Sequence, residues 1–121
     1  MILKMRLNEI RNKYMNIVKD KFLGGSEALE ELSYDILKLL ETSPRKYKIP
    51  LFVLHEIFWE IAHDQERRMV TLDEAKMLYL ELHKPILDLI DALVNNADEK
   101  TLLEITTSLI EKFYETFHQK S

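Results

Sequence analysis

Apolar side chains recur every three to four positions along most of this 121-residue chain, which is the spacing of helices that bury one face. Glycine occurs only at Gly24 and Gly25, and proline only at Pro44, Pro50 and Pro85, so few residues interrupt these stretches. No segment alternates convincingly between apolar and polar residues with a period of two. The pattern predicts an all-α protein.

The first helix is expected over about 2–22, where the apolar stripe stops before the glycine pair. Ser26 is placed to cap a second helix, which a Ser-Pro step ends. We expect a loop over 43–49, because Pro50 is well suited to the first position of a third helix. That helix should run to about Arg67.

The sequence TLDE, from Thr71 to Glu74, has the form of a capping box and is expected to begin a fourth helix. The apolar stripe of this segment stays in phase across Pro85. A stripe that keeps its phase through a proline predicts one kinked helix rather than two. A fifth helix is expected to start near Asp98 and to run to the end of the chain.

Five amphipathic segments with short connections predict a single domain, a compact antiparallel bundle of four to five helices. The connections are expected at 23–26, 43–49, 67–71 and 95–98. Side chains from all five segments are expected in the core, including Leu7, Ile10, Leu32, Ile36, Leu54, Phe58, Ile61, Tyr79, Leu82, Ile86, Leu109 and Phe113.

The net charge of −4 is divided unevenly along the chain. Residues 1–48 carry ten lysine and arginine residues against seven acidic ones, a charge of +3, whereas residues 49–121 carry seven against fourteen, a charge of −7. This difference can attract the two parts to each other within one molecule, or it can create a dipolar surface for a partner. The first use is the commoner one.

The chain has no cysteine, which excludes disulfides, thiol catalysis and zinc sites built from thiolates. No apolar run is long enough to span a bilayer, so no membrane insertion is expected. The first residues are charged and lack the apolar region of a secretory signal. A cytoplasmic location is therefore the default expectation.

Two Glu-x-x-His pairs, Glu60 with His63 and Glu115 with His118, have the spacing with which four-helix bundles hold two metal ions. A metal site in a bundle core requires these side chains to point inward. On a helical wheel they lie about 120° to 180° from the apolar centres of their helices. The pairs are therefore interpreted as surface residues, and no metal or cofactor is expected there.

His55 and His83 lie closer to the apolar faces of the third and fourth helices. If these helices form a hairpin, the two imidazoles fall almost level with each other. They are weak candidates for a metal site or a pH-sensitive contact. Without a third ligand at that level, packing of half-buried rings is the favoured interpretation.

The sequence PRKYK, at 44–48, is the only cluster of basic and aromatic residues, a combination that can contact phosphates and stack on a base. In an up-and-down bundle it lies at the same end as the start of the first helix. Nucleic-acid binding is possible there but is not favoured for an acidic chain. The candidate residues are Lys4, Arg6, Arg45, Lys46 and Lys48.

Lysine and arginine flank the apolar stripe of the first helix, and acidic residues repeat every seven positions on the fourth. Such patterns resemble the charged positions that select a partner helix. With apolar residues left off the main stripes, they predict a dimer in which the first helix takes part. The expected interface residues are Leu3, Leu7, Lys4, Arg11, Glu74, Glu81 and Asp88.

No nucleotide-binding loop, catalytic serine motif or zinc-protease motif is present, so an enzyme is not expected. The leading hypothesis is a non-enzymatic protein–protein interaction module, either a homo-oligomer or a small subunit of a larger assembly. The alternatives are a nucleic-acid-associated accessory protein and a metal- or pH-responsive bundle.

Overall fold

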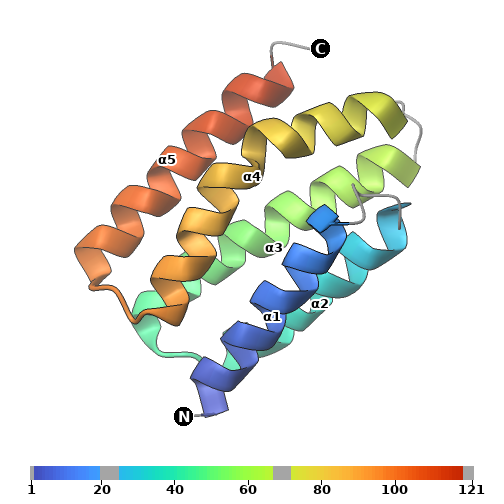
Figure 1. Ribbon diagram of the computed structural model, residues 1–121. Helices are drawn as coiled ribbons and strands as arrows, with labels where there is room; N and C mark the ends of the chain where they lie inside the picture. Colours follow the sequence, from blue (N-terminus) through green and yellow to red (C-terminus); the bar gives the residue numbers. More distant parts are fainter. Residues whose placement is uncertain (1, 20–24, 67–71, 119–121) are drawn as a thin grey trace.

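A computed structural model describes residues 2–19, 25–66 and 72–118, and in these ranges the chain forms five helices and no strand (Figure 1). The predicted all-α bundle is thereby confirmed. The helices are α1 (Ile2–Lys19), α2 (Gly25–Thr42), α3 (Arg45–Glu66), α4 (Leu72–Val94) and α5 (Glu99–His118).

Successive helices run in opposite directions, so that α3 and α5, with α4 between them in the chain, run the same way (Figure 1). Helix α1 packs against α2 and α4, and α5 packs against α3 and α4. Helix α3 contacts α2, α4 and α5, and α4 contacts α1, α3 and α5, so these two helices are the central elements. The side-by-side contact of α3 and α5 forms one face of the molecule.

The core contains the predicted apolar side chains that the structure describes, with one difference. Phe113 is half-buried and packs against the core rather than inside it. The side chain of Tyr79 lies outside the described residues. The phase of the apolar stripes thus identified the buried face of each helix correctly.

Helix α3 begins at Arg45, so the prediction of a loop over 43–49 was wrong. Pro50 lies inside the helix and leaves one carbonyl of the first turn without its usual amide partner. Tyr47, in the same first turn, is buried. Its hydroxyl lies 3.1 Å from the carbonyl oxygen of Leu93 and 2.9 Å from Oδ1 of Asn96, at the end of α4.

Helix α4 continues through Pro85, as predicted. Figure 1 shows that it changes direction near its middle, which agrees with the expected kink. A proline inside a helix removes one backbone hydrogen bond and displaces the preceding turn. The apolar stripe remains in the core on both sides of the bend, with Leu82 and Ile86 fully buried.

The predicted connection at 95–98 is present and closes α4 with a Schellman arrangement. The amide of Ala97 donates to the carbonyl of Ala92, and the amide of Asn96 donates to that of Leu93. Asn96 adopts the left-handed conformation that this arrangement requires, with φ of 56°. Asp98 then caps α5, since its Oδ1 accepts the amide hydrogen of Thr101 at 2.8 Å.

Candidate interaction surface

A groove of about 150 Å³ lies between α3 and α5 on the outer face of the bundle. It exists because the two helices lie side by side while their outward positions carry large apolar side chains. We call it the α3–α5 groove. Its lining consists of Phe52, Val53, Glu56, Ile57, Glu60, Ile110, Phe113 and Tyr114.

Three of the lining side chains are large, apolar and open to solvent. Phe52 is 49% exposed, Ile110 39% and Tyr114 59%. Single exposed apolar residues are ordinary on a protein surface, but a group around one hollow is typical of a binding surface. Aromatic residues of this kind often supply most of the energy of protein–protein contacts.

The apolar surface continues toward the N-terminal ends of both helices. Ile49 lies seven residues before Glu56, and Leu103 lies seven before Ile110, so each falls on the same side of its helix as the groove. Ile49 is 58% exposed and Leu103 42%. From Leu103 to Tyr114 the strip is about 16 Å long, or three helical turns.

The charge of the groove comes entirely from one side. Among the described residues that line it, Glu56 and Glu60 on α3 are the only charged ones. They are one helical turn apart and therefore lie along the same edge. The α5 side contributes Ile110, Phe113 and Tyr114, none of which is an acidic or basic residue. The groove is thus apolar with one acidic edge.

The sequence did not reveal this surface. Phe52 and Tyr114 lie on the polar sides of their helices, and Val53 is an apolar residue off the main stripe of its helix. An aromatic residue on a polar helix face was the available signal. It could not show that α3 and α5 are neighbours, because that depends on the packing of the whole bundle.

The two candidate histidines contact different helices. Nδ1 of His55 lies 2.8 Å from the carbonyl oxygen of Ser33 on α2, and Nδ1 of His83 lies 2.8 Å from the hydroxyl of Tyr14 on α1. His55 is buried, and its Nε2 is 3.9 Å from a carboxylate oxygen of Glu56. Each ring therefore links its own helix to a different neighbour.

The first Glu-x-x-His pair lies on the outer side of α3, as the wheel indicated. Glu60 is exposed, and the ring of His63 stacks on Trp59 with a centroid distance of 3.7 Å. Glu115 is exposed on α5, and the side chain of His118 lies outside the described residues. Within the described parts of the chain, no three acidic or histidine side chains come close enough together to hold a metal ion.

Two basic residues of the predicted nucleic-acid cluster, Lys46 and Lys48, make hydrogen bonds within the chain. Lys46 Nζ donates to the carbonyl of Ala97 at 3.2 Å, and Lys48 Nζ donates to that of Leu40 at 2.8 Å. Tyr47 is buried, so its ring has no open face for a base. The predicted cluster therefore lacks its stacking partner.

Two of the remaining candidate cations line different hollows. Lys4 lines a hollow with Tyr47 and Asn96, so it lies at the predicted end of the bundle. Arg6 lines a separate hollow between α1 and α2. Arg45 is exposed at the start of α3.

The predicted interface on α1 is largely used inside the molecule. Leu7 is only 2% exposed and belongs to the core, so it leaves little surface for a contact between subunits. Leu3 is partly buried against the same core, whereas Lys4 is exposed. Arg11 Nε lies 2.6 Å from Oδ1 of Asp91 on α4.

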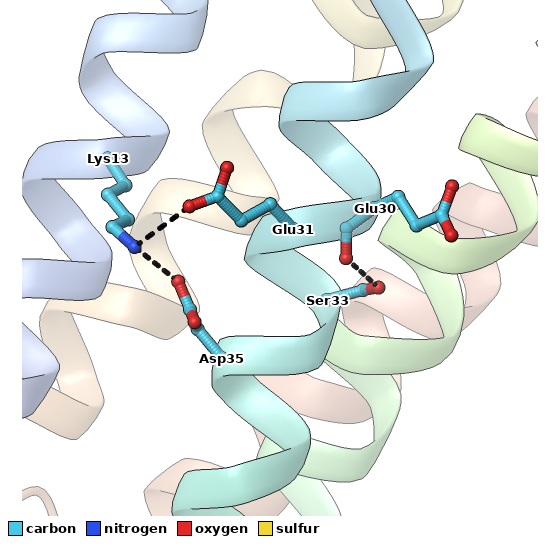
Figure 2. A network of polar contacts seen from close by, with 5 residues as sticks. All are labelled: Lys13, Glu30, Glu31, Ser33 and Asp35. Atoms are coloured by element: carbon cyan, nitrogen blue, oxygen red, sulfur yellow. Dashed lines mark hydrogen bonds and ion pairs between the residues drawn. The ribbon is translucent and has the colours of Figure 1, made fainter.

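A second cation of α1 is paired in the same way. Figure 2 shows Lys13 between Glu31 and Asp35 of α2, with its Nζ 3.6 Å from the glutamate oxygen. The hydrogen bond with Asp35 is the largest cause of the raised pKa of Lys13. Figure 2 also shows Ser33, whose hydroxyl donates to the carbonyl of Glu30. The two ion pairs of Lys13 join α1 to α2 within the same chain.

The acidic residues of α4 differ from one another. Glu81 is exposed, and Asp88 pairs with Lys84 one turn earlier at 3.2 Å. The side chain of Glu74 lies outside the described residues. Met5 on α1 and Met77 on α4 are large apolar residues, and both are exposed.

Over its described length, the chain has no helix that is both long enough and apolar enough to cross a membrane. The chain matches no protein-family model, no curated protein and no solved structure.

Proposed function

We propose that this protein is a non-enzymatic interaction module that binds a helix of a partner protein in the α3–α5 groove. The supporting observation is the exposure of Phe52, Ile110 and Tyr114 around one hollow. Covering such a side chain completely contributes about 1.5–3 kcal/mol. The three side chains are already partly covered, so a partner can recover part of this stabilisation from each of them.

The shape of the groove favours a helix as the bound element. A channel between two neighbouring helices accepts the ridge of side chains on a third, and helix-in-groove binding is a common mode of recognition. The strip from Leu103 to Tyr114 matches three turns of such a helix. Helix α3 and helix α5 would then form the floor of a three-helix contact.

The test is to isolate a partner with the intact protein and to measure its binding after purification. Phe52→Glu places a charge in the groove, while Leu80→Glu is the matched control. Leu80 is exposed on α4, three residues before His83, which contacts α1. It therefore lies on the α1 side of α4, away from the groove.

We expect a purified partner to bind the intact protein and the Leu80→Glu control equally. Phe52→Glu should weaken binding at least about tenfold, as for a central aromatic contact. Circular dichroism and thermal melts must show that both variants remain folded. Equal binding by both variants would contradict the proposal.

Light scattering distinguishes a second copy of the chain from a different protein. A dimer that Phe52→Glu separates would show that the groove serves self-association. It would overturn the proposal that the groove binds a helix of a different protein. The predicted dimer through α1 has less support, because Leu7, Arg11 and Lys13 make contacts within the chain.

The other two hypotheses from the sequence remain predictions. Binding of nucleic acid by Lys4, Arg6 and Arg45 would appear as a mobility shift that weakens with salt. A metal at His55 and His83 would appear in elemental analysis of the purified protein.

A further inference from the structure

We infer that a hollow between α1 and α2 binds the phosphate group of a small organic molecule. The hollow has a volume of about 260 Å³ and shares no lining residue with the α3–α5 groove, so it is a separate site. We call it the α1–α2 hollow. Three cations line it, Arg6 and Lys13 from α1 and Lys38 from α2. Cations that reach one hollow from two neighbouring helices are suited to an anion.

In the parts of the chain that the structure describes, only one of these three cations is paired with acidic residues. Figure 2 shows Lys13 between the carboxylates of Glu31 and Asp35 of α2. Arg6 and Lys38 are exposed, and neither makes an ion pair or a hydrogen bond with another described residue. Two positive charges of the hollow are therefore available to a ligand.

The register of α1 and α2 places these two cations opposite each other. The helices run in opposite directions, and Lys13 of α1 pairs with Glu31 of α2. Arg6 lies seven residues before Lys13, and Lys38 lies seven residues after Glu31. Seven residues are about two turns, so both cations lie on the same sides of their helices as the ion pair and level with each other. Like charges that face each other repel, and an anion between them removes this cost.

One carboxylate of the hollow reduces its positive charge without cancelling it. Glu9 lies one turn after Arg6 on α1 and lines the same hollow, but it forms no ion pair with Arg6. Since Asp35 balances Lys13, the lining keeps two cations against one carboxylate. The hollow is therefore suited to a small anion, and Glu9 lowers the affinity.

The chemistry of the lining favours a phosphate monoester over other anions. Such a group carries about −1.5 to −2 charges at neutral pH and three acceptor oxygens, enough for donors from both helices. The planar guanidinium of Arg6 can donate two hydrogen bonds to it, and the ammonium of Lys38 can donate another. The buried side chains of Ile10 and Leu39 also line the hollow and offer an apolar contact to the organic part. The volume is below the roughly 300–1,000 Å³ of pockets for drug-sized ligands, so the molecule must be small.

The experiment titrates the full-length, ¹⁵N-labelled protein with three probes at constant ionic strength and follows its amide resonances by NMR. The probes are n-propyl phosphate, inorganic phosphate and butyrate, at a pH of about 7.5, where the phosphate group is largely doubly ionised. We expect n-propyl phosphate to give saturable shifts at residues 5–13 and 35–39. Butyrate, with one charge and two oxygens, should bind at least about threefold more weakly. Equal binding of inorganic phosphate would overturn the contribution of Ile10 and Leu39.

Variants of the two available cations then test the site directly. Arg6→Gln with Lys38→Gln should weaken the binding of n-propyl phosphate at least about tenfold. The matched control is Lys100→Gln with Lys112→Gln, which removes the same charge from exposed positions of α5 that do not line the hollow. It should leave the affinity unchanged. Glu9→Gln keeps both cations, and it should tighten binding about two- to fivefold because a like charge is removed.

Several results would overturn the inference. These are the absence of saturable shifts with n-propyl phosphate, shifts centred away from the hollow, and an equal loss with both pairs of glutamine substitutions, which would indicate general electrostatic attraction. Amide spectra show whether each variant remains folded. If the variant of both cations did not fold, unchanged affinity in Glu9→Gln would still contradict the site. Because the two sites share no residue, none of these results decides whether the α3–α5 groove binds a helix.

Discussion

The hydroxyl of Tyr14 on α1 lies 2.8 Å from Nδ1 of His83 on α4, and the two rings are stacked with centroids 5.6 Å apart. Tyr14 is fully buried, and its ring also lies 5.7 Å from that of Phe58 on α3. One side chain thus connects three helices. The contact satisfies a polar hydroxyl that would otherwise be costly inside the core.

Replacing Tyr14 by phenylalanine removes this hydrogen bond and keeps the ring. We expect Tyr14→Phe to lower the free energy of unfolding by about 1 kcal/mol, the usual net value of one such bond. Urea denaturation measures the change, which should shift the midpoint without changing the slope. Tyr34→Phe is the control, since Tyr34 is exposed and should change stability by less than about 0.5 kcal/mol. Equal effects would contradict a special role for Tyr14.

Burial raises the pKa of Tyr14, and this predicts a loss of stability at alkaline pH. Above pH about 10 the unfolded chain releases the phenolic proton while the folded chain retains it. The contribution of Tyr14 to the free energy of unfolding is therefore fully present below pH about 10. Above that pH it decreases by up to about 1.4 kcal/mol per pH unit. Urea denaturation from about pH 8 to about pH 11 measures this slope, because the range spans the ordinary tyrosine pKa of about 10.

Tyr14→Phe should reduce that alkaline slope without abolishing it. Burial also raises the pKa of Tyr47, so a second tyrosine contributes in the same direction. Identical slopes for the intact protein and the variant would show that Tyr14 ionises equally in the folded and unfolded states.

Asp98 predicts the opposite dependence in acid. Hydrogen bonds from the hydroxyl and amide of Thr101 lower the pKa of its carboxyl group, and Lys46 adds a smaller attraction. Its contribution is present above the ordinary pKa of about 4 and is lost as the pH falls through the lower folded value. Thermal melts of Asp98→Asn and the intact protein measure it. Asparagine still caps the helix, so the variant should differ mainly in losing this pH dependence. If the stabilities of the two proteins decreased equally as the pH falls, Asp98 would not be the source of the acid dependence.

Much of the fold could be predicted because each helix buries a continuous apolar stripe. The continuation of α4 through Pro85 was correct, since its stripe keeps its phase on both sides. The predicted start of α3 was wrong. The hydroxyl of Tyr47 is hydrogen-bonded to Leu93 and Asn96, which are more than forty residues away in sequence, and the helix already includes Tyr47. Local preference for Pro50 at a helix start could not account for that contact.

The candidate surface was harder to predict for the same reason. An exposed aromatic such as Phe52 has no periodic signal that names its neighbour, and Tyr114 reaches the same groove only through the packing of α3 on α5. The apolar pattern also shows that α1 buries one face. It does not show whether that face is buried in the same chain or against a second subunit. The structure places Leu7 in the core of its own chain.

The last prediction concerns α1 and self-association. Leu7→Asp puts a charge into the core, and Leu→Ala replacements at such sites already cost about 2–5 kcal/mol. We therefore expect this variant to lose cooperative unfolding at every protein concentration. Met5→Asp is the control on the exposed side of the same helix, and it should stay within about 0.5 kcal/mol of the intact protein.

Protein concentration separates folding from assembly in this experiment, because the stability of a dimer increases with concentration whereas that of a monomer does not. Urea midpoints at two concentrations, together with light scattering, provide the measurement. A Leu7→Asp variant that remains folded but becomes monomeric would contradict the burial of Leu7 in its own bundle and restore α1 as the dimer contact. A Met5→Asp variant that separates a dimer without unfolding would instead place the contact on the exposed side of α1.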